Sequence, residues 1–177
     1  MRRTAGLLAL ALAWSATAAP EPSAELQAKM TGTFRLAESE QAVKERLTAA
    51  IEHAIEPMNF IARPVARSRL QRPVYYCKRY ELALDAETVH VACDDRPRVD
   101  RRLDNSEGPA IGLDAEPLDV QVSTGADSVQ IVFTSADGER TTTYRFGDAG
   151  ALEVDVEVGS ASLERPVAWK VRYRRAD

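Results

Sequence analysis

The segments LEVDVEV (152–158) and VAWKVRY (167–173) alternate strictly between apolar residues and charged or small ones. Such an alternation is typical of β-strands that bury one face in a core. If the first residue of one segment pairs with the last residue of the other, apolar residues meet on one face, and Glu153 lies opposite Arg172 on the other. Each cross-strand pair contributes only about 0.2–1 kcal/mol. Because a single register satisfies both faces, we predict an antiparallel hairpin here.

Three more strands continue the same apolar face upstream. Asp137-Gly138 and Gly125-Ala126 are two-residue turn signals of β-hairpins, and a short loop at 147–151 precedes the hairpin described above. With these turns at the hairpin tips, the predicted partners on the apolar face are Val122 with Val129, Phe133 with Thr142, and Phe146 with Leu152. The pattern therefore predicts a meander of five consecutive strands.

Two helices are expected after a first strand at 31–37. Ser39 is a good N-cap for the first helix, in which apolar residues recur at helical spacing. Pro57 ends that helix and is expected to open the second as its first residue. The second helix runs to Leu70, with a kink or a break at Pro64.

The remaining segments indicate one more short helix and further strands. Residues 23–30 can form one or two helical turns. Alternation over 74–84 and 88–93 predicts a hairpin, the charged stretch 94–105 is a strand or a loop, and 109–113 is one more short strand. A sheet of about eight to ten strands with one apolar face curls and closes. We therefore predict a mainly β fold, an antiparallel up-and-down β-barrel with two helices inserted after the first strand.

Residues 1–19 have the features of a secretory signal peptide. Two arginines precede an apolar run over 5–14, and residues 16–18 match an Ala-x-Ala cleavage site. No cysteine follows the run, so a lipoprotein anchor is not expected. We expect an exported protein, periplasmic or secreted, in which 20–177 form one domain with a helical insert at 39–70.

The charge of the chain argues against nucleic acid as a partner. Without the signal peptide the 23 basic residues fall by two to 21, against 27 acidic residues, so the net charge is −6. Nucleic-acid binding would require a basic stripe, whereas these charges are interspersed. The one locally basic region contains Arg63, Arg67 and Arg69. Two interpretations remain open for it: contact with an anionic membrane surface or a protein partner, or a helix whose arginines lie in water.

Residue patterns typical of catalysis or metal binding are missing from the sequence. His53 and His90 are isolated from further metal ligands. Asp94 and Asp95 begin a tract in which acids and arginines alternate, which is typical of a solvated hairpin. Because no nucleophile and base occur in a recognisable arrangement, we expect no catalysis, no metal and no cofactor.

Cys77 and Cys93 give two opposing indications. An exported protein usually pairs its two cysteines. However, Cys77 has the opposite parity to the apolar residues of 74–84, whereas Cys93 shares the parity of the apolar residues of 88–93. The two sulfurs would then lie on opposite faces of the hairpin. A disulfide and two separate cysteines both remain open.

Gly32-Thr33-Phe34 in the first strand, the helical insert right after it and the meander to the C-terminus together resemble the calycin superfamily of lipocalins and fatty-acid-binding proteins. Lipocalins open with Gly-x-Trp, so Phe34 stands where tryptophan would. In fatty-acid-binding proteins an inward Arg-x-Tyr on the last strand holds the fatty-acid carboxylate. Here Val171 and Tyr173 share a face and the arginines take the other, so that anchor is absent. The resemblance implies a barrel with a helical lid.

The predicted interior is almost wholly apolar, and an eight-stranded barrel can either be filled by its side chains or hold one small ligand. The candidate ligand contacts are apolar and aromatic residues expected to face the lumen: Phe34, Phe60, Val120, Ile131, Phe133, Tyr144, Val156, Trp169 and Tyr173. Two functions remain open. One is a non-catalytic carrier or scavenger of a small apolar ligand, and the other is a structural or partner-binding protein with a filled barrel.

Overall fold

The computed structural model describes residues 21–111, 117–147 and 150–176. In these ranges the chain forms α1 (Ala24–Met30), β1 (Gly32–Leu36), α2 (Glu40–Ile55), α3 (Ala62–Leu70), β2 (Arg79–Leu84), β3 (Thr88–Cys93), β4 (Val99–Arg102), β5 (Ala110–Ile111), β6 (Pro117–Thr124), β7 (Ser128–Thr134), β8 (Glu139–Phe146), β9 (Ala151–Gly159) and β10 (Val167–Arg175). No helix in the described ranges is long and apolar enough to cross a membrane.

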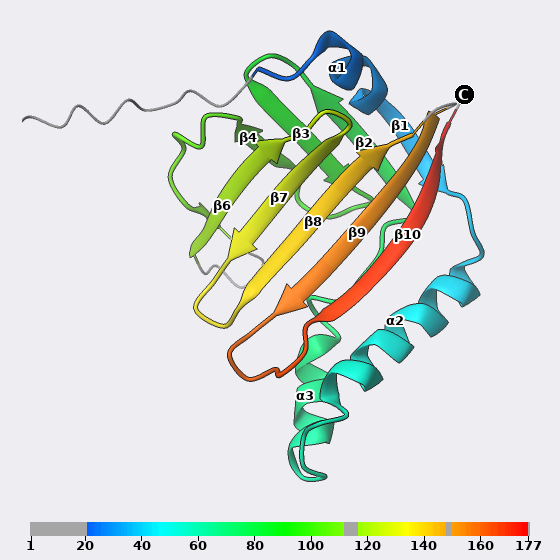
Figure 1. Cartoon of the computed structure of the whole chain (residues 1–177), viewed down its shortest axis with the longest axis vertical. Helices are drawn as coiled ribbons and strands as arrows, with labels where there is room; N and C mark the ends of the chain where they lie inside the picture. The colour runs from blue at the N-terminus through cyan, green and yellow to red at the C-terminus, as the bar shows by residue number, and fades with distance from the viewer. Residues whose placement is uncertain (1–20, 112–116, 148–149, 177) are drawn as a thin grey trace, which may run out of the picture.

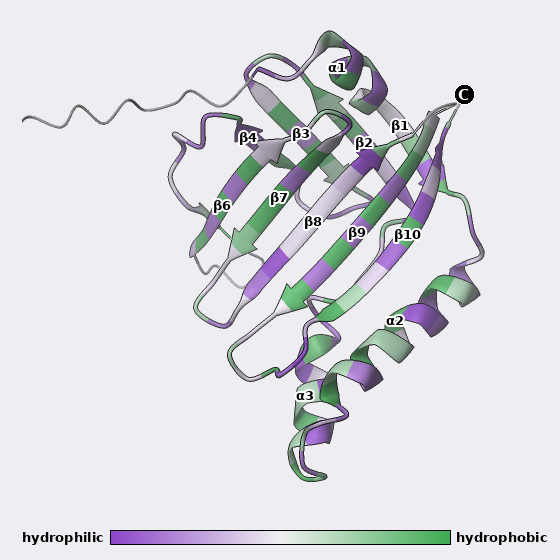
Figure 2. Cartoon of the chain, in the orientation of Figure 1, coloured by the Kyte–Doolittle hydropathy of each residue, from purple (hydrophilic) through white to green (hydrophobic). Residues whose placement is uncertain are grey.

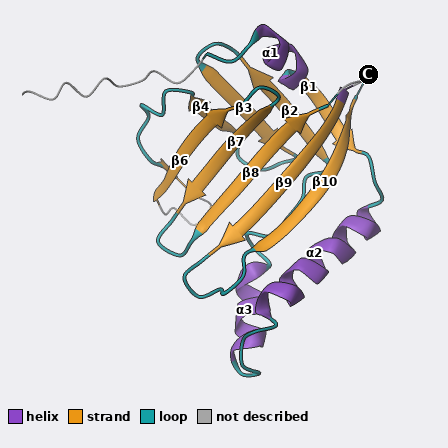
Figure 3. Cartoon of the chain, viewed as in Figure 1, coloured by secondary structure: helices purple, strands orange, loops and turns teal. Residues whose placement is uncertain are grey.

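All ten strands belong to one antiparallel sheet, which confirms the predicted fold class. Their order is β4-β3-β2-β1-β10-β9-β8-β7-β6-β5, so β1 pairs with β10 while β4 and β5 form the two ends. This pairing of the first and last strands curls the sheet around one interior (Figures 1 and 3). Hydrophobic and hydrophilic residues alternate along β9 and β10 (Figure 2). As predicted, α2 and α3 are inserted after β1.

The two C-terminal registers are confirmed, whereas the two upstream registers are wrong by two residues. The observed partners are Leu152 with Tyr173, Phe146 with Leu152, Phe133 with Arg140, and Val122 with Ile131. A shift of two residues leaves every side chain on its predicted face, because the side-chain period of a strand is two. The prediction of one continuous apolar face is therefore unaffected.

Both upstream hairpins turn one residue away from the predicted tips. The backbone N–H of Ser135 donates to the Gly138 carbonyl at 2.8 Å, which places Ala136-Asp137 at one tip. The matching bond from Gly125 to Ser128 places Ala126-Asp127 at the other. Gly138 is needed for another reason: a Cβ there would overlap the carbonyl oxygen of Gly159. The glycine therefore marks a close approach of two backbones, which the sequence pattern alone does not distinguish from a turn.

The second inserted helix begins at Ala62, so the prediction that Pro57 opens it is wrong. The side-chain oxygen of Asn59 accepts the backbone N–H groups of Ile61 and Ala62, at 3.1 and 2.9 Å, and caps the helix from within the loop. Pro64 is the third residue of the helix, where its missing N–H breaks no helical hydrogen bond and causes no break. By contrast, Ser39 caps α2 as predicted.

Helix α2 covers the edge of β10 that β1 leaves unpaired. The β1–β10 pairing stops at Leu36 with Tyr173. Beyond it, a Glu38 side-chain oxygen accepts the Arg172 N–H at 2.9 Å, and the Arg46 guanidinium donates to the Lys170 carbonyl. The same guanidinium holds the pKa of the Glu38 carboxyl below its usual range. The side chains of Glu38, just before α2, and of Arg46 in α2 therefore take the place of a neighbouring strand.

In the described part of the chain, the Asn105 side chain joins the sheet across the seam between β4 and β6. The side-chain oxygen of Asn105, just after β4, accepts the Val122 N–H at 2.6 Å, and its amide nitrogen donates to the Val122 carbonyl at 3.0 Å. This is the reciprocal bonding of a paired strand residue, made by one amide group. Asn105 has a φ of +54°, a conformation that asparagine adopts more readily than most residues.

We expect replacement of Asn105 by alanine to lower the free energy of unfolding by about 1–2 kcal/mol, because two hydrogen bonds are lost. Asn105→Gly, which also lacks the amide but tolerates a positive φ, separates the loss of hydrogen bonds from backbone strain. Hydrogen exchange of the Val122 amide is the direct readout. Unchanged exchange in both variants would contradict a role in joining the seam.

Candidate ligand site in the barrel interior

The predicted lumen residues lie in the interior, with one correction. Seven of them are buried: Phe34, Val120, Ile131, Tyr144, Val156, Trp169 and Tyr173. Phe133 is partly buried and packs against the core. Phe60 is 82% exposed, so the prediction that it lines the lumen is wrong. The reason is local: the loop that precedes α3 is fixed by Asn59, and this loop turns Phe60 into solvent.

Tyrosines occupy part of the interior. The ring of Tyr80 meets Tyr144 edge-on at 5.6 Å between centroids and meets Tyr173 at 5.0 Å. The Tyr173 hydroxyl donates to the Cys77 carbonyl at 2.9 Å. Burial raises the pKa of all three phenols well above the ordinary value, so they are neutral at physiological pH. This part of the barrel is a packed aromatic core with neutral hydroxyl groups.

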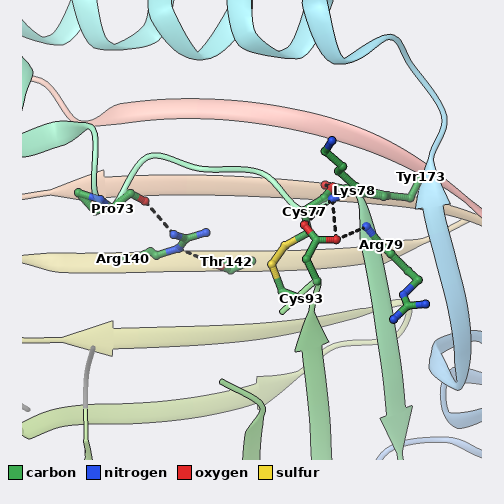
Figure 4. Close-up of a disulfide and its surroundings, with 9 residues drawn as sticks. Pro73, Cys77, Lys78, Arg79, Cys93, Arg140, Thr142 and Tyr173 are labelled. Atoms are coloured by element: carbon green, nitrogen blue, oxygen red, sulfur yellow. Dashed lines mark hydrogen bonds between the residues drawn. A yellow bond between two sulfur atoms is a disulfide. The ribbon is translucent and has the colours of Figure 1, made fainter. Parts of the chain in front are cut away.

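Arg140 brings a positive charge to the inward face of β8. It shares parity with Thr142 and Tyr144, both buried, and its guanidinium donates to the Pro73 carbonyl at 2.8 Å (Figure 4). The guanidinium also lies over the ring of Tyr75, 3.8 Å from the centroid. Sequence reasoning missed this residue, although the parity of β8 already placed it on the apolar face.

Trp169 places an unpartnered hydrogen-bond donor beside Arg140. The indole is 5% exposed, and its Nε1 is buried with no hydrogen-bond partner among the described residues. The Arg140 guanidinium carbon lies 5.8 Å from the centre of the Trp169 ring. A buried donor without an acceptor costs about 1–3 kcal/mol. The interior therefore holds a donor and a cation that favour an acceptor or an anion from outside the chain.

The segment Pro73–Cys77, here called the strap, crosses the inward face of the sheet between α3 and β2 (Figure 4). Cys77 forms a disulfide with Cys93 at the end of β3. The parity argument against this bond was wrong because β2 begins only at Arg79, so Cys77 precedes the pleated strand. The Asp94 carboxylate accepts the Arg79 N–H at 2.8 Å and fixes the same end of the strap.

On the outer face, a chain of hydrogen bonds links Asp85, Thr88, His90 and Asp100. The Thr88 Oγ1 lies 3.2 Å from the His90 Nε2, and the His90 Nδ1 lies 2.6 Å from an Asp100 oxygen. Catalysis by such a set would require the hydroxyl proton to pass to the histidine. In this structure the Thr88 hydroxyl instead donates to a side-chain oxygen of Asp85, at 2.6 Å. The chain of bonds therefore ties β3 to β4 and to the turn before β3.

No known family model matches this chain, and no curated protein sequence matches it. Among solved structures it is similar to lipid binding protein 8 of Caenorhabditis elegans, with 14% identity, a TM-score of 0.52, and coverage of 88% of this chain and 99% of that one. It is also similar to fatty-acid-binding protein 1 of Echinococcus granulosus, with 10% identity, a TM-score of 0.51, and coverage of 85% of this chain and 99% of that one. A third similar structure is the fatty acid transporter REP1-NXSQ, with 12% identity, a TM-score of 0.50, and coverage of 83% of this chain and 96% of that one. The chain therefore has the calycin fold of fatty-acid-binding proteins, and this likeness is one of fold.

Proposed function

We propose that this protein binds a small amphipathic molecule, with an apolar body in the barrel and an anionic head at Arg140 and Trp169. The observation that supports this most strongly is the unpartnered Trp169 N–H beside the Arg140 guanidinium, in an interior that is otherwise largely apolar. A carboxylate would form charge-assisted hydrogen bonds with both groups. The names of the similar structures, a lipid binding protein and a fatty-acid-binding protein, agree with this class of ligand.

In this proposal the protein is a non-catalytic carrier or scavenger that works after export. Each methylene group moved from water into the barrel contributes about 0.8 kcal/mol, so the apolar body supplies most of the affinity. The head group adds orientation and selectivity. Export rests on the signal-peptide features of residues 1–19, which lie outside the described residues.

The test compares hexadecanoic acid with hexadecanol, which share a tail and differ in the head group. Native mass spectrometry of the protein, before and after delipidation, shows what it carries and which compound it takes up. We expect a one-to-one complex with the acid and affinity for the acid at least about tenfold higher than for the alcohol. Uptake of neither compound would support the alternative, a structural or partner-binding protein with a filled barrel.

A second candidate function, membrane contact, is favoured by an exposed apolar group around the start of α3. Phe60 is 82% exposed, Ile61 71% and Val65 56%. The loop is held in this form, because the Arg63 guanidinium donates to the backbone carbonyls of Met58 and Glu56 at 2.8 and 2.6 Å. We call Phe60, Ile61 and Val65 the tip.

The charge around the tip fits an anionic lipid surface. Residues 57–72 contain four arginines and no acidic residue, although the chain as a whole is acidic. Arg67 is paired with Glu52 through two bonds of 2.6 and 2.7 Å, whereas Arg69 is exposed. Apolar side chains among arginines can enter the lipid headgroup region while the guanidinium groups contact phosphates.

We expect the protein to bind vesicles of phosphatidylcholine and phosphatidylglycerol, and to bind phosphatidylcholine alone much more weakly. Joint replacement of Phe60 and Ile61 by serine should lower the bound fraction in co-sedimentation at least about tenfold, because two large side chains lose their burial in lipid. The matched control is Ile111→Ser, on β5, where another large apolar side chain is 73% exposed. Equal losses in both variants, or equal binding to both vesicles, would contradict the proposal.

A further inference from the structure

We infer that the strap is an autoinhibitory element. Its Pro73 carbonyl and Tyr75 ring contact the Arg140 guanidinium, which the head group of the ligand needs. This inference rests on the proposed function. The Pro73 carbonyl already accepts from Arg140 at 2.8 Å, and Tyr75 covers the face of the same guanidinium. A ligand that reaches Arg140 must therefore displace the strap.

Tyr75 separates two arginines rather than one. The Arg96 guanidinium carbon lies 3.5 Å from the centre of the Tyr75 ring, and the Arg140 carbon lies 3.8 Å from it. Neither Arg96 nor Arg140 makes an ion pair with a carboxylate in the described ranges. The Arg96 guanidinium contacts Tyr75, and the Arg140 guanidinium contacts Tyr75, Trp169, Thr142 and Pro73. When the ring leaves, an anionic head can bind between the two cations.

Replacing the strap contacts at Arg140 by a ligand head group is favourable when the head group is an anion and unfavourable when it is neutral. The Pro73 carbonyl is a neutral acceptor, and hydrogen bonds from arginine to an ionised carboxylate are roughly twice as strong as those between neutral groups. The stacked ring contributes about 0.5–2 kcal/mol for each cation. A hydroxyl head would lose those contacts without gaining a charge-assisted bond. The strap therefore selects for acids over alcohols of equal length.

The two ends of the strap are held differently, which defines where it moves. Cys77 is bonded to Cys93, and its carbonyl accepts from Tyr173, so this end is fixed. The other end continues from α3, where the Val74 N–H donates to the Leu70 carbonyl at 3.1 Å. The part that can move is therefore Pro73 to Tyr76, which would turn about the disulfide with loss of the Val74–Leu70 bond and of the Tyr76 contact with Glu40.

Hydrogen exchange of the wild-type protein tests this directly, with hexadecanoic acid as the probe. We expect the peptide that contains Val74, Tyr75 and Tyr76 to exchange at least about tenfold faster in the complex, because displacement breaks the Val74–Leu70 hydrogen bond and exposes this segment to water. The buried strands should exchange more slowly at the same time. Slower or unchanged exchange in the strap of a protein that binds the acid would overturn the inference and leave the proposed function intact.

Tyr75→Ala is the complementary variant. We expect it to tighten binding of the acid by at least roughly fivefold, because two ring–cation contacts of about 0.5–2 kcal/mol each no longer have to be broken. Tyr75→Leu is a second variant in case alanine disturbs folding. It keeps the bulk of the side chain but lacks the aromatic face, and it should also bind the acid more tightly than the wild type. The matched control is Tyr75→Phe, which keeps an aromatic ring over both guanidinium groups and should leave the affinity unchanged. Weaker binding in both the alanine and the leucine variant would overturn the inference, whereas no binding by the wild type would overturn the proposed function as well.

Discussion

Replacing Arg140 with methionine should weaken binding of hexadecanoic acid by about ten- to a hundredfold and should not weaken binding of hexadecanol. The guanidinium is the one charged group whose contacts place it on the inward face of β8, among Thr142, Trp169 and the strap, in the described part of the barrel. Hydrogen bonds to charged groups contribute about 1.5–3 kcal/mol, which corresponds to this loss. The measurement is a pair of titrations, one for each ligand.

The control for this prediction is Arg145→Met on the same strand. Arg145 points outward and forms an ion pair with Asp155, so its loss should leave both affinities unchanged. An equal loss of acid and alcohol binding in Arg140→Met would show that Arg140 supports the fold and does not select the head group. Thermal unfolding of both variants separates these two results.

The second large effect concerns the disulfide. Replacing Cys77 and Cys93 together with alanine should lower the free energy of unfolding by about 3 kcal/mol, because the bond joins residues 16 apart in sequence and restricts the unfolded chain. Alanine is the suitable replacement because both sulfurs are buried. Denaturant unfolding of the wild type with and without a reducing agent is the control. A midpoint that is the same in both conditions would contradict a stabilising bond.

Much of the fold could be predicted because strand parity survives errors of register. The upstream pairs, such as Phe133 with Arg140, differ from prediction by two residues, and an even shift keeps each side chain on its face. The helix at Ser39 followed from its cap, which is a local signal. The start of α3 depends on the Asn59 side chain and the Arg63 contacts, which no spacing rule reveals.

The candidate site was only partly predictable, for a different reason. The apolar lining follows from alternation, so residues such as Trp169 and Tyr173 could be placed in advance. Arg140 lies on the same face by parity, but alternation predicts apolar residues on that face and gives no signal for a charged one. The strap could not be predicted, since its position depends on a contact between Pro73 and Arg140 that are 67 residues apart.

The seam between β4 and β6 has a consequence for self-association. The sheet ends at β4 and β5, and the Asn105 side-chain amide joins the β4 side to Val122 of β6, so loss of this amide leaves the facing edge of β6 without these two hydrogen bonds. Free borders recruit matching strands from other copies of the same chain. Loss of the Asn105 amide is therefore expected to lower the solubility of the protein at high concentration before any loss of secondary structure.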